Sequence, residues 1–201
     1  MTQKIRSKYS GILEINYING QKVLDSKNTS YSYGNLQKVW DKILQKISLQ
    51  GAERILILGM GGGSSIRLLR EKYNYNKKIV AVELDPVIVE IAETEFGIHA
   101  DKNLVIECMD AADYVLKKTR KFDLILIDLF IDDKVPGKFL SREFWKAVAG
   151  KTGPAGKIIF NAFEDENKLI AVMDELTIGG LSVRLFPKVN GSNMMVYGER
   201  K

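Results

Sequence analysis

Short apolar runs alternate with helical patterns from Arg54 onward. Between the runs, apolar positions recur at the three- and four-residue spacing of amphipathic helices. The predicted strands cover residues 54–58, 78–83, 104–109, 122–128 and 157–163, and the predicted helices cover residues 64–73, 86–96, 111–118, 139–149 and 166–178. Strands that are apolar throughout and separated by helices are typical of a parallel sheet covered on both faces.

The two ends of the chain follow a different pattern. Near the N-terminus, Asn19–Gly20 separates two strand-like runs and predicts a β-hairpin, followed by a polar loop over 27–35 and a helix over 36–48. Near the C-terminus, two strand-like runs flank Asn190–Gly191 with no helix between them, so the last strand should run antiparallel to the others. We therefore expect a hairpin-and-helix appendage over residues 1–50 and an α/β domain over residues 51–201.

Composition narrows the class of protein. The chain has 201 residues, of which 45% are hydrophobic, and we find no signal peptide or membrane span, so a cytoplasmic location is expected. Cys108 is the single cysteine, fits a reducing compartment and is expected to be buried in a strand. The net charge is +5, and residues 1–50 hold eight Lys/Arg against three acids. Because these lysines are scattered, they favour a solvated surface over a nucleic-acid site.

A glycine-rich segment follows the first strand of the α/β region, in the stretch ILILGMGGGSS. Gly59 to Ser64 nearly fit G-x-G-x-x-G/A, a pattern that permits a tight strand-to-helix turn and a close approach of backbone to ligand. Ser64 and Ser65 stand where a P-loop would carry its lysine, so a triphosphate site is not expected. Gly59, Gly61 and Gly63 therefore predict a dinucleotide or nucleoside site, unless the turn is purely structural.

Acidic residues follow three of the other strands, whose carboxyl ends should meet at one edge of the sheet. Glu83 lies twenty residues beyond Gly63 and can accept hydrogen bonds from both ribose hydroxyls. Asp110 can accept a hydrogen bond from an adenine amine, cap the next helix, or do both. Asp128 ends the fourth strand, where it either acts as a base or satisfies backbone amides.

Two ligand classes remain open at this point. NAD and S-adenosylmethionine are both held by a glycine loop and a ribose-binding acid. Asp110 suits an adenine amine, and a parallel sheet closed by an antiparallel hairpin is typical of the methyltransferase fold, whereas dinucleotide folds are usually parallel throughout. Asp85, followed by Pro86, is interpreted as the cap of the next helix, which leaves the ribose role to Glu83.

The segments ILILGMGGGSS, VAVELDP, MDAADYV, FDLILIDLF and FLSREFWKAV together resemble the spermidine/spermine synthase family and its short methyltransferase-like relatives. The resemblance implies a Rossmann-like, seven-stranded, mostly parallel sheet behind a small N-terminal β-hairpin. It also implies S-adenosylmethionine or its decarboxylated form as cofactor and makes a homodimer plausible. No metal is expected, because His99 is the single histidine and lies in a polar loop. The implied cofactor-binding residues are Gly59, Gly61, Gly63, Glu83, Asp110, Ala111 and Asp128, with Asp128 also the catalytic residue.

The chain departs from that family where a diamine would be held. Gly62 stands where the family's loop has an aspartate, and Ile131 replaces a second aspartate, although Asp132 and Asp133 follow. Burying a diamine dication requires several carboxylates. We therefore favour methyl transfer to a small-molecule acceptor of unknown identity, by in-line displacement at the sulfonium carbon. The alternatives are a spermidine-synthase-type aminopropyltransferase and a non-catalytic nucleoside-binding module. Residues 129–144 could form a lid over the site.

Overall fold

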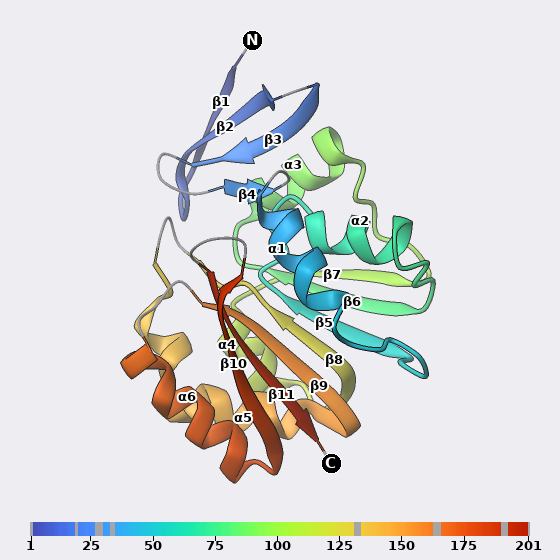
Figure 1. The fold of residues 1–201 in the computed structure, drawn as a ribbon. Coiled ribbons are helices and arrows are strands. Elements are labelled where there is room, and N and C mark those ends of the chain that lie inside the picture. Colours follow the sequence, from blue (N-terminus) through green and yellow to red (C-terminus); the bar gives the residue numbers. More distant parts are fainter. Residues whose placement is uncertain are drawn as a thin grey trace.

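The fold consists of two β-sheets joined by a helix (Figure 1). The computed structural model describes residues 2–18, 20–26, 30–32, 35–130, 134–162, 166–189 and 193–200. The smaller sheet is antiparallel in the order β1-β2-β3-β4, and helix α1 follows it. These elements are β1 (Gln3–Ser7), β2 (Gly11–Ile18), β3 (Gln21–Asp25), β4 (Ser30–Ser32) and α1 (Asn35–Leu44).

The larger sheet has seven strands in the order β10-β11-β9-β8-β5-β6-β7. Strands β9, β8, β5, β6 and β7 pair in parallel, and β11 is antiparallel to both β9 and β10. The predicted seven-stranded, mostly parallel sheet with an antiparallel C-terminal hairpin is therefore confirmed. Its strands are β5 (Arg54–Leu58), β6 (Lys78–Glu83), β7 (Leu104–Cys108), β8 (Phe122–Ile127), β9 (Thr152–Ala162), β10 (Leu181–Val189) and β11 (Asn193–Arg200).

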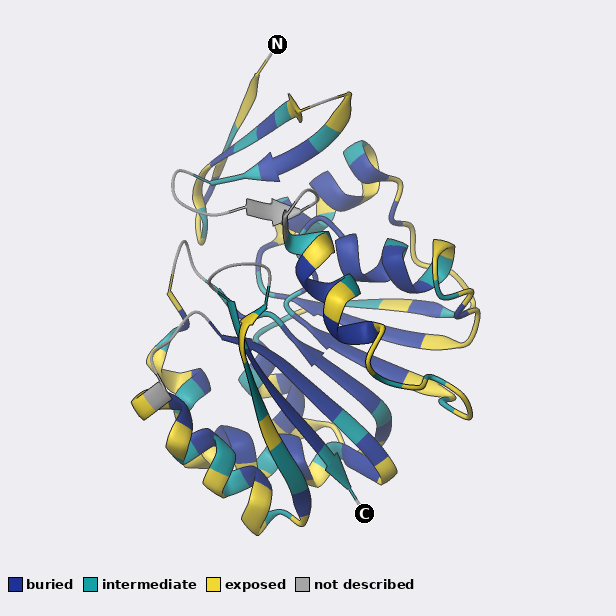
Figure 2. Cartoon of the chain, viewed as in Figure 1, coloured by how far each residue is buried: buried dark blue, intermediate teal, exposed yellow. Residues whose placement is uncertain are grey.

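Helices cover both faces of this sheet and create two buried layers (Figure 2). Apolar side chains of α1, α2 and α3 pack on one face, in a cluster that also contains Leu13 and Leu24 of the smaller sheet. Side chains of α4, α5 and α6 pack on the other face. The bounds are α2 (Ser64–Glu71), α3 (Pro86–Phe96), α4 (Ala111–Lys117), α5 (Arg142–Lys151) and α6 (Glu166–Ile178).

Three local predictions were wrong. Part of the expected loop over 27–35 forms strand β4, which continues the small sheet beside β3. The expected helix over 139–149 is divided into a 3-10 helix, η1 (Gly137–Leu140), and α5, because the hydroxyl of Ser141 caps α5 by accepting from Phe144 N at 3.3 Å. Cys108, which was expected to be buried, is exposed because β7 lies at the edge of the larger sheet, where side chains are less covered than on a central strand.

Two expected turn positions, Asn19 and Asn190–Gly191, lie outside the described residues. Across the described part of the chain, no helix combines the length and apolar character needed to cross a membrane.

The smaller sheet stands over the carboxyl edge of the larger one (Figure 1). The hydroxyl groups of Ser7 and Ser10 both donate to the Asp85 carboxylate, which follows β6, the second of them at 2.8 Å. Lys22 of β3 pairs with Glu95 of α3 at 2.8 Å. The N-terminal segment is thus attached beside the edge at which the functional residues were expected.

Candidate functional site

The carboxyl ends of β6, β5 and β8 are neighbours in the larger sheet. Glu83 ends β6, the glycine segment follows β5, and Asp128 follows β8. The glycine segment therefore lies between the two acids. The sequence predicted that all three would lie at one edge of the sheet, but not their order. The structure brings these residues together at one edge, where neighbouring groups hold each of them in place.

The glycine segment depends on conformations that other residues would strain. Gly59 has a φ of +86°, and a Cβ atom there would lie 2.0 Å from the main-chain oxygen of Asp128. Gly63 has a φ of +85°, and a Cβ atom would lie 2.5 Å from Cγ1 of Ile98. Gly61 also has a positive φ, of 53°. The glycines thus let the turn pass close to the Asp128 backbone and begin α2.

Main-chain amides hold Glu83 in place. Its Oε2 accepts from the Gly61 amide at 2.9 Å and its Oε1 accepts from the Asp85 amide at 3.1 Å. Burial raises the pKa of the Glu83 carboxyl, which is 9% exposed, despite these hydrogen bonds. Because a carboxylate has about four acceptor positions, each oxygen can still accept a further donor such as a ribose hydroxyl.

Asp85 serves as the predicted helix cap and also as an attachment point. Its Oδ1 accepts from the Val87 amide at 3.0 Å at the start of α3, and Pro86 occupies the first turn. Its Oδ2 accepts the two serine hydroxyls of the N-terminal segment, and the side chain is 1% exposed. The capping prediction is confirmed, whereas the attachment had no local sequence signal.

Asp110 caps α4, which was one of its two predicted roles. Its Oδ1 accepts from the Ala112 amide at 2.8 Å, and its Oδ2 pairs with the Lys138 ammonium of η1. Burial raises the pKa of Asp110, but the Lys138 ammonium and the amide outweigh it and lower the pKa overall. Ala111 is buried as the first residue of α4. Lys138 therefore occupies an acceptor that the sequence assigned to an adenine amine.

Side chains from two distant elements hold Asp128. Trp40 Nε1 of α1 donates to Oδ2 at 3.1 Å, and Asn161 Nδ2 of β9 donates to Oδ1 at 2.9 Å. Asn193 Nδ2 of β11 in turn donates to Oδ1 of Asn161 at 2.9 Å. Burial raises the pKa of Asp128 to about 6, although both hydrogen bonds act to lower it. At neutral pH this carboxyl is an ionised group with a pKa suited to proton transfer.

Sequence reasoning missed part of this arrangement. It included Trp40 only within the helix predicted over residues 36–48, and Asn161 only within the strand predicted over residues 157–163. Asn193 carried no signal at all. The indole nitrogen of a predicted core tryptophan was the one available hint, since a buried Trp N–H usually has a hydrogen-bond partner. Ile131, Asp132 and Asp133, which bear on a second acceptor-binding acid, lie outside the described residues.

The residues at this edge suit the nucleoside that the sequence suggested. Two buried glutamate oxygens with remaining acceptor capacity, a turn with glycine at positions 59, 61, 62 and 63 and a nearby carboxylate are compatible with a ribose joined to a sulfonium group. Among the described residues, no group of three or more His, Cys, Asp and Glu side chains could hold a metal ion.

The chain is similar to known proteins over much of its length. The spermine/spermidine synthase domain matches residues 44–176. A polyamine aminopropyltransferase of Vibrio vulnificus (strain CMCP6) is 35% identical over 114 residues, which cover 55% of this chain and 38% of that protein. The eEF1A lysine and N-terminal methyltransferase of Danio rerio is 28% identical over 117 residues, which cover 53% of this chain and 17% of that protein.

Solved structures show the same fold. A probable spermidine synthase from Corynebacterium glutamicum ATCC 13032 has a TM-score of 0.78 at 19% identity, covering 99% of this chain and 80% of that one. Human methyltransferase-like protein 13 in complex with SAH has a TM-score of 0.59 at 23% identity, covering 83% of this chain and 79% of that one. With the matched domain spanning most of the chain, this protein belongs to the spermine/spermidine synthase family.

Proposed function

We propose that the protein is an aminopropyltransferase that uses decarboxylated S-adenosylmethionine and an amine acceptor. The observation that carries the choice of aminopropyl transfer is the similarity of this chain to curated aminopropyltransferases. Asp128, a partly buried acid of raised pKa beside the glycine turn that also holds the buried acid Glu83, supports a transferase with a sulfonium donor. This reverses the preference for methyl transfer, which rested on Gly62 and Ile131 standing where the family has aspartates, since the similarity to aminopropyltransferases favours the other reaction.

The chemistry follows from a sulfonium donor. The amine nitrogen forms a bond to the donor's aminopropyl carbon while the carbon–sulfur bond breaks, and the electron pair remains on sulfur as a neutral thioether. An alkyl amine has a pKa near ~10, so its nitrogen must lose a proton before it attacks. Asp128 would accept that proton, and with a pKa of about 6 it is ionised at neutral pH. The protein's other task is to align the amine and the carbon.

Glu83 and the glycine turn would hold the donor nucleoside. The free acceptor capacity of Glu83 suits the two ribose hydroxyls, and its charge disfavours a phosphate on that sugar. Asp110 would face the adenine side, where its pairing with Lys138 must be shared or broken. These assignments make the acid after β6 a binding group and the acid after β8 a reacting group.

Methyl transfer from S-adenosylmethionine is the second candidate. Its support is the likeness to a human methyltransferase-like protein in complex with SAH and to the Danio rerio methyltransferase. Both candidates use in-line displacement at a carbon bonded to sulfonium, so they share Asp128 and Glu83 and differ in the group that moves.

Product analysis separates the candidates. The purified protein is incubated with putrescine and either decarboxylated S-adenosylmethionine or S-adenosylmethionine, and the amine products are identified by mass spectrometry. We expect an amine heavier by one aminopropyl group with the decarboxylated donor. A methylated amine with the intact donor would instead select the second candidate. Donor binding without any product, identical in the Asp128→Asn variant, would indicate a non-catalytic binding module.

A further inference from the structure

Both oxygens of the Asp128 carboxylate are held by neutral donors from elements remote in sequence. Trp40 Nε1 donates to Oδ2 at 3.1 Å, and Asn161 Nδ2 donates to Oδ1 at 2.9 Å. Two donors on two different oxygens fix the plane of a carboxylate, whereas one donor would leave it free to rotate. Each oxygen keeps acceptor capacity for a second partner.

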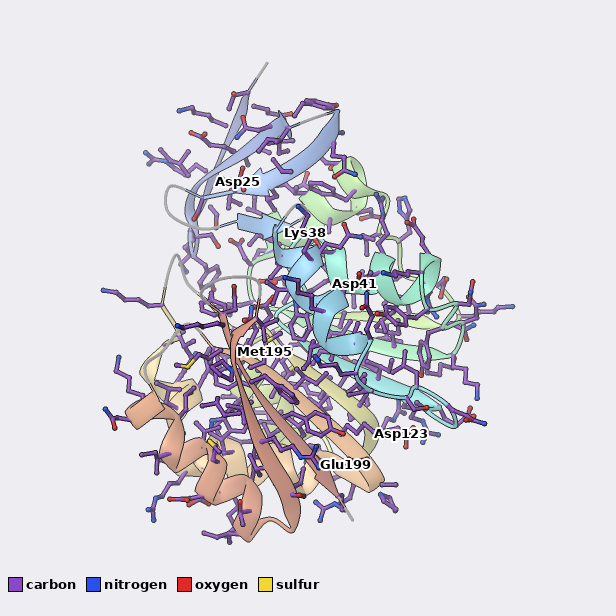
Figure 3. The ribbon with its side chains drawn as sticks, in the orientation of Figure 1. Asp25, Lys38, Asp41, Asp123, Met195 and Glu199 are labelled. Carbon is purple, nitrogen blue, oxygen red and sulfur yellow. The ribbon has the colours of Figure 1, made fainter. Side chains whose placement is uncertain are left out.

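The donors are themselves fixed in place. Asp41, the residue after Trp40, accepts from Tyr73 Oη at 2.8 Å and pairs with Lys72 Nζ at 2.5 Å, which attaches α1 to the end of α2. Figure 3 shows Asp41 on this helix and Met195 on β11. Met195 is fully buried in the same cluster as Trp40, so the indole ring is packed as well as hydrogen bonded.

Asn161 is oriented from the other side. Its amide oxygen accepts from Asn193 Nδ2 at 2.9 Å, which leaves its amide nitrogen directed at Asp128. The series Asn193, Asn161, Asp128 and Trp40 therefore links the C-terminal strand, the centre of the sheet and helix α1. A serial arrangement of this kind transmits a fixed orientation from packed elements to a single carboxylate.

We propose that Trp40 is a positioning residue, which together with Asn161 holds the Asp128 carboxylate in the orientation needed for proton transfer. The proposal rests on the proposed function for the role of Asp128 as base, but the positioning itself can be measured without turnover. The match to the family domain begins at residue 44, and Trp40 precedes it. The proposal therefore gives the segment before that domain a direct role in the site.

The surroundings of Asp128 make its protonation sensitive to these two donors. The side chains that contact it from α1 and β9 do not titrate, and Glu83 lies across the glycine turn at the end of β6. Figure 3 shows Asp123 and Glu199 toward the far end of the sheet. The other charged residues on the described parts of α1, β8, β9 and β11 are Lys38, Asp41, Lys42, Asp123, Lys157, Glu199 and Arg200.

Several of these charged groups have partners elsewhere. Lys157 pairs with Glu199 at 3.6 Å, Asp123 accepts from the Arg54 amide at 2.9 Å, and Arg200 donates to the Ala149 carbonyl at 2.8 Å. Burial and two neutral hydrogen bonds therefore account for the pKa of about 6 at Asp128. Removing one of those bonds raises the pKa, because the ionised form loses a donor.

The second tryptophan of the chain offers a matched control. Trp145 of α5 is fully buried, and its Nε1 donates to the Phe139 carbonyl at 2.8 Å. Trp40→Phe and Trp145→Phe each remove a buried indole and its hydrogen bond, but only the first bond ends on Asp128. A difference between the two variants thus reports the contact with Asp128 rather than the loss of packing.

The first test is the pH dependence of kcat/KM with the substrates identified by product analysis. In the wild-type protein we expect activity to fall as the pH drops through about 6, where Asp128 becomes protonated. In Trp40→Phe the midpoint should rise by about one pH unit, as expected for loss of one hydrogen bond to a charged group. Trp145→Phe should leave the midpoint unchanged. Equal midpoints in all three proteins would overturn the proposal.

The second test needs neither turnover nor a Trp40 substitution. The chain has two tryptophans, so Trp145→Phe retains Trp40 as its single indole fluorophore. Its emission should titrate with a midpoint near pH 6, and this titration should vanish when Asp128→Asn is added. Emission that does not change between pH 5 and 8 would contradict the contact. A clear titration in a protein that forms no product would support positioning while rejecting the proposed reaction.

Discussion

Glu83, a buried carboxyl group, and Asp128, a partly buried one, lie on either side of one glycine turn, yet the protein holds them by different means. Glu83 accepts from two main-chain amides, those of Gly61 and Asp85, which are 22 and 2 residues away in sequence. Asp128 accepts from two side chains, those of Trp40 and Asn161, which are 88 and 33 residues away.

The difference separates a binding group from a reacting group. Main-chain amides are present whatever the side chains are, so the position of Glu83 follows from the strand, the turn and the helix around it. Asp128 depends on two particular side chains, and substitutions there can change its protonation without altering the fold. Burial raises the pKa of both groups, but only Asp128 relies on side-chain donors to offset that effect.

The largest expected effect comes from Asp128→Asn. The amide keeps the size of the side chain but cannot accept a proton, so we expect kcat to fall by about a thousandfold, the range seen for loss of a general base. Donor affinity, measured by calorimetry, should stay within about threefold of the wild-type value. A comparable loss of affinity and turnover would show that Asp128 binds the donor rather than reacting.

A smaller effect is expected from Glu83→Gln on the binding side. Loss of the charged acceptor should weaken donor binding by at least about tenfold, since hydrogen bonds to charged groups are worth about 1.5–3 kcal/mol. Glu107→Gln is the matched control, because Glu107 lies on the neighbouring strand β7 and pairs with Lys118 at 3.8 Å. If both variants bind the donor as the wild-type protein does, Glu83 does not hold the ribose.

The smallest effect is expected at Asp110. Lys138→Met removes the ammonium that pairs with this acid, so an adenine amine would no longer compete for it. We expect donor binding to tighten by at most about threefold, in line with the small energies of partly exposed ion pairs. Lys117→Met, which breaks the Lys117–Asp113 pair on the surface of α4, should change nothing. Markedly weaker binding in Lys138→Met would mean that the lysine itself contacts the donor.

The same contrast explains which parts of the fold the sequence could predict. The alternation of apolar runs and helices located the central strands, and the turn between β5 and α2 could be identified because its glycines and Glu83 act through nearby backbone. The cap formed by Asp85 was predictable for the same reason. These features depend on interactions within short segments, which local patterns describe well.

Features that depend on distant contacts were missed. The role of Trp40 requires α1 to lie over the end of β8, and nothing in residues 36–48 specifies that neighbour. Strand β4 forms because β3 offers an edge, and Cys108 is exposed because β7 is the last strand of the larger sheet in the described part of the chain. The lysine of η1 likewise reaches Asp110 only through the path of the chain after β8.

The central claim is that the edge formed by β6, β5 and β8 binds an adenosyl sulfonium donor. Calorimetric titration of the wild-type protein with decarboxylated S-adenosylmethionine, S-adenosylmethionine and NAD tests it most directly. We predict saturable binding of the decarboxylated donor, weaker binding in Glu83→Gln, and no saturable binding of NAD. Tighter binding of NAD than of either sulfonium donor would contradict the account.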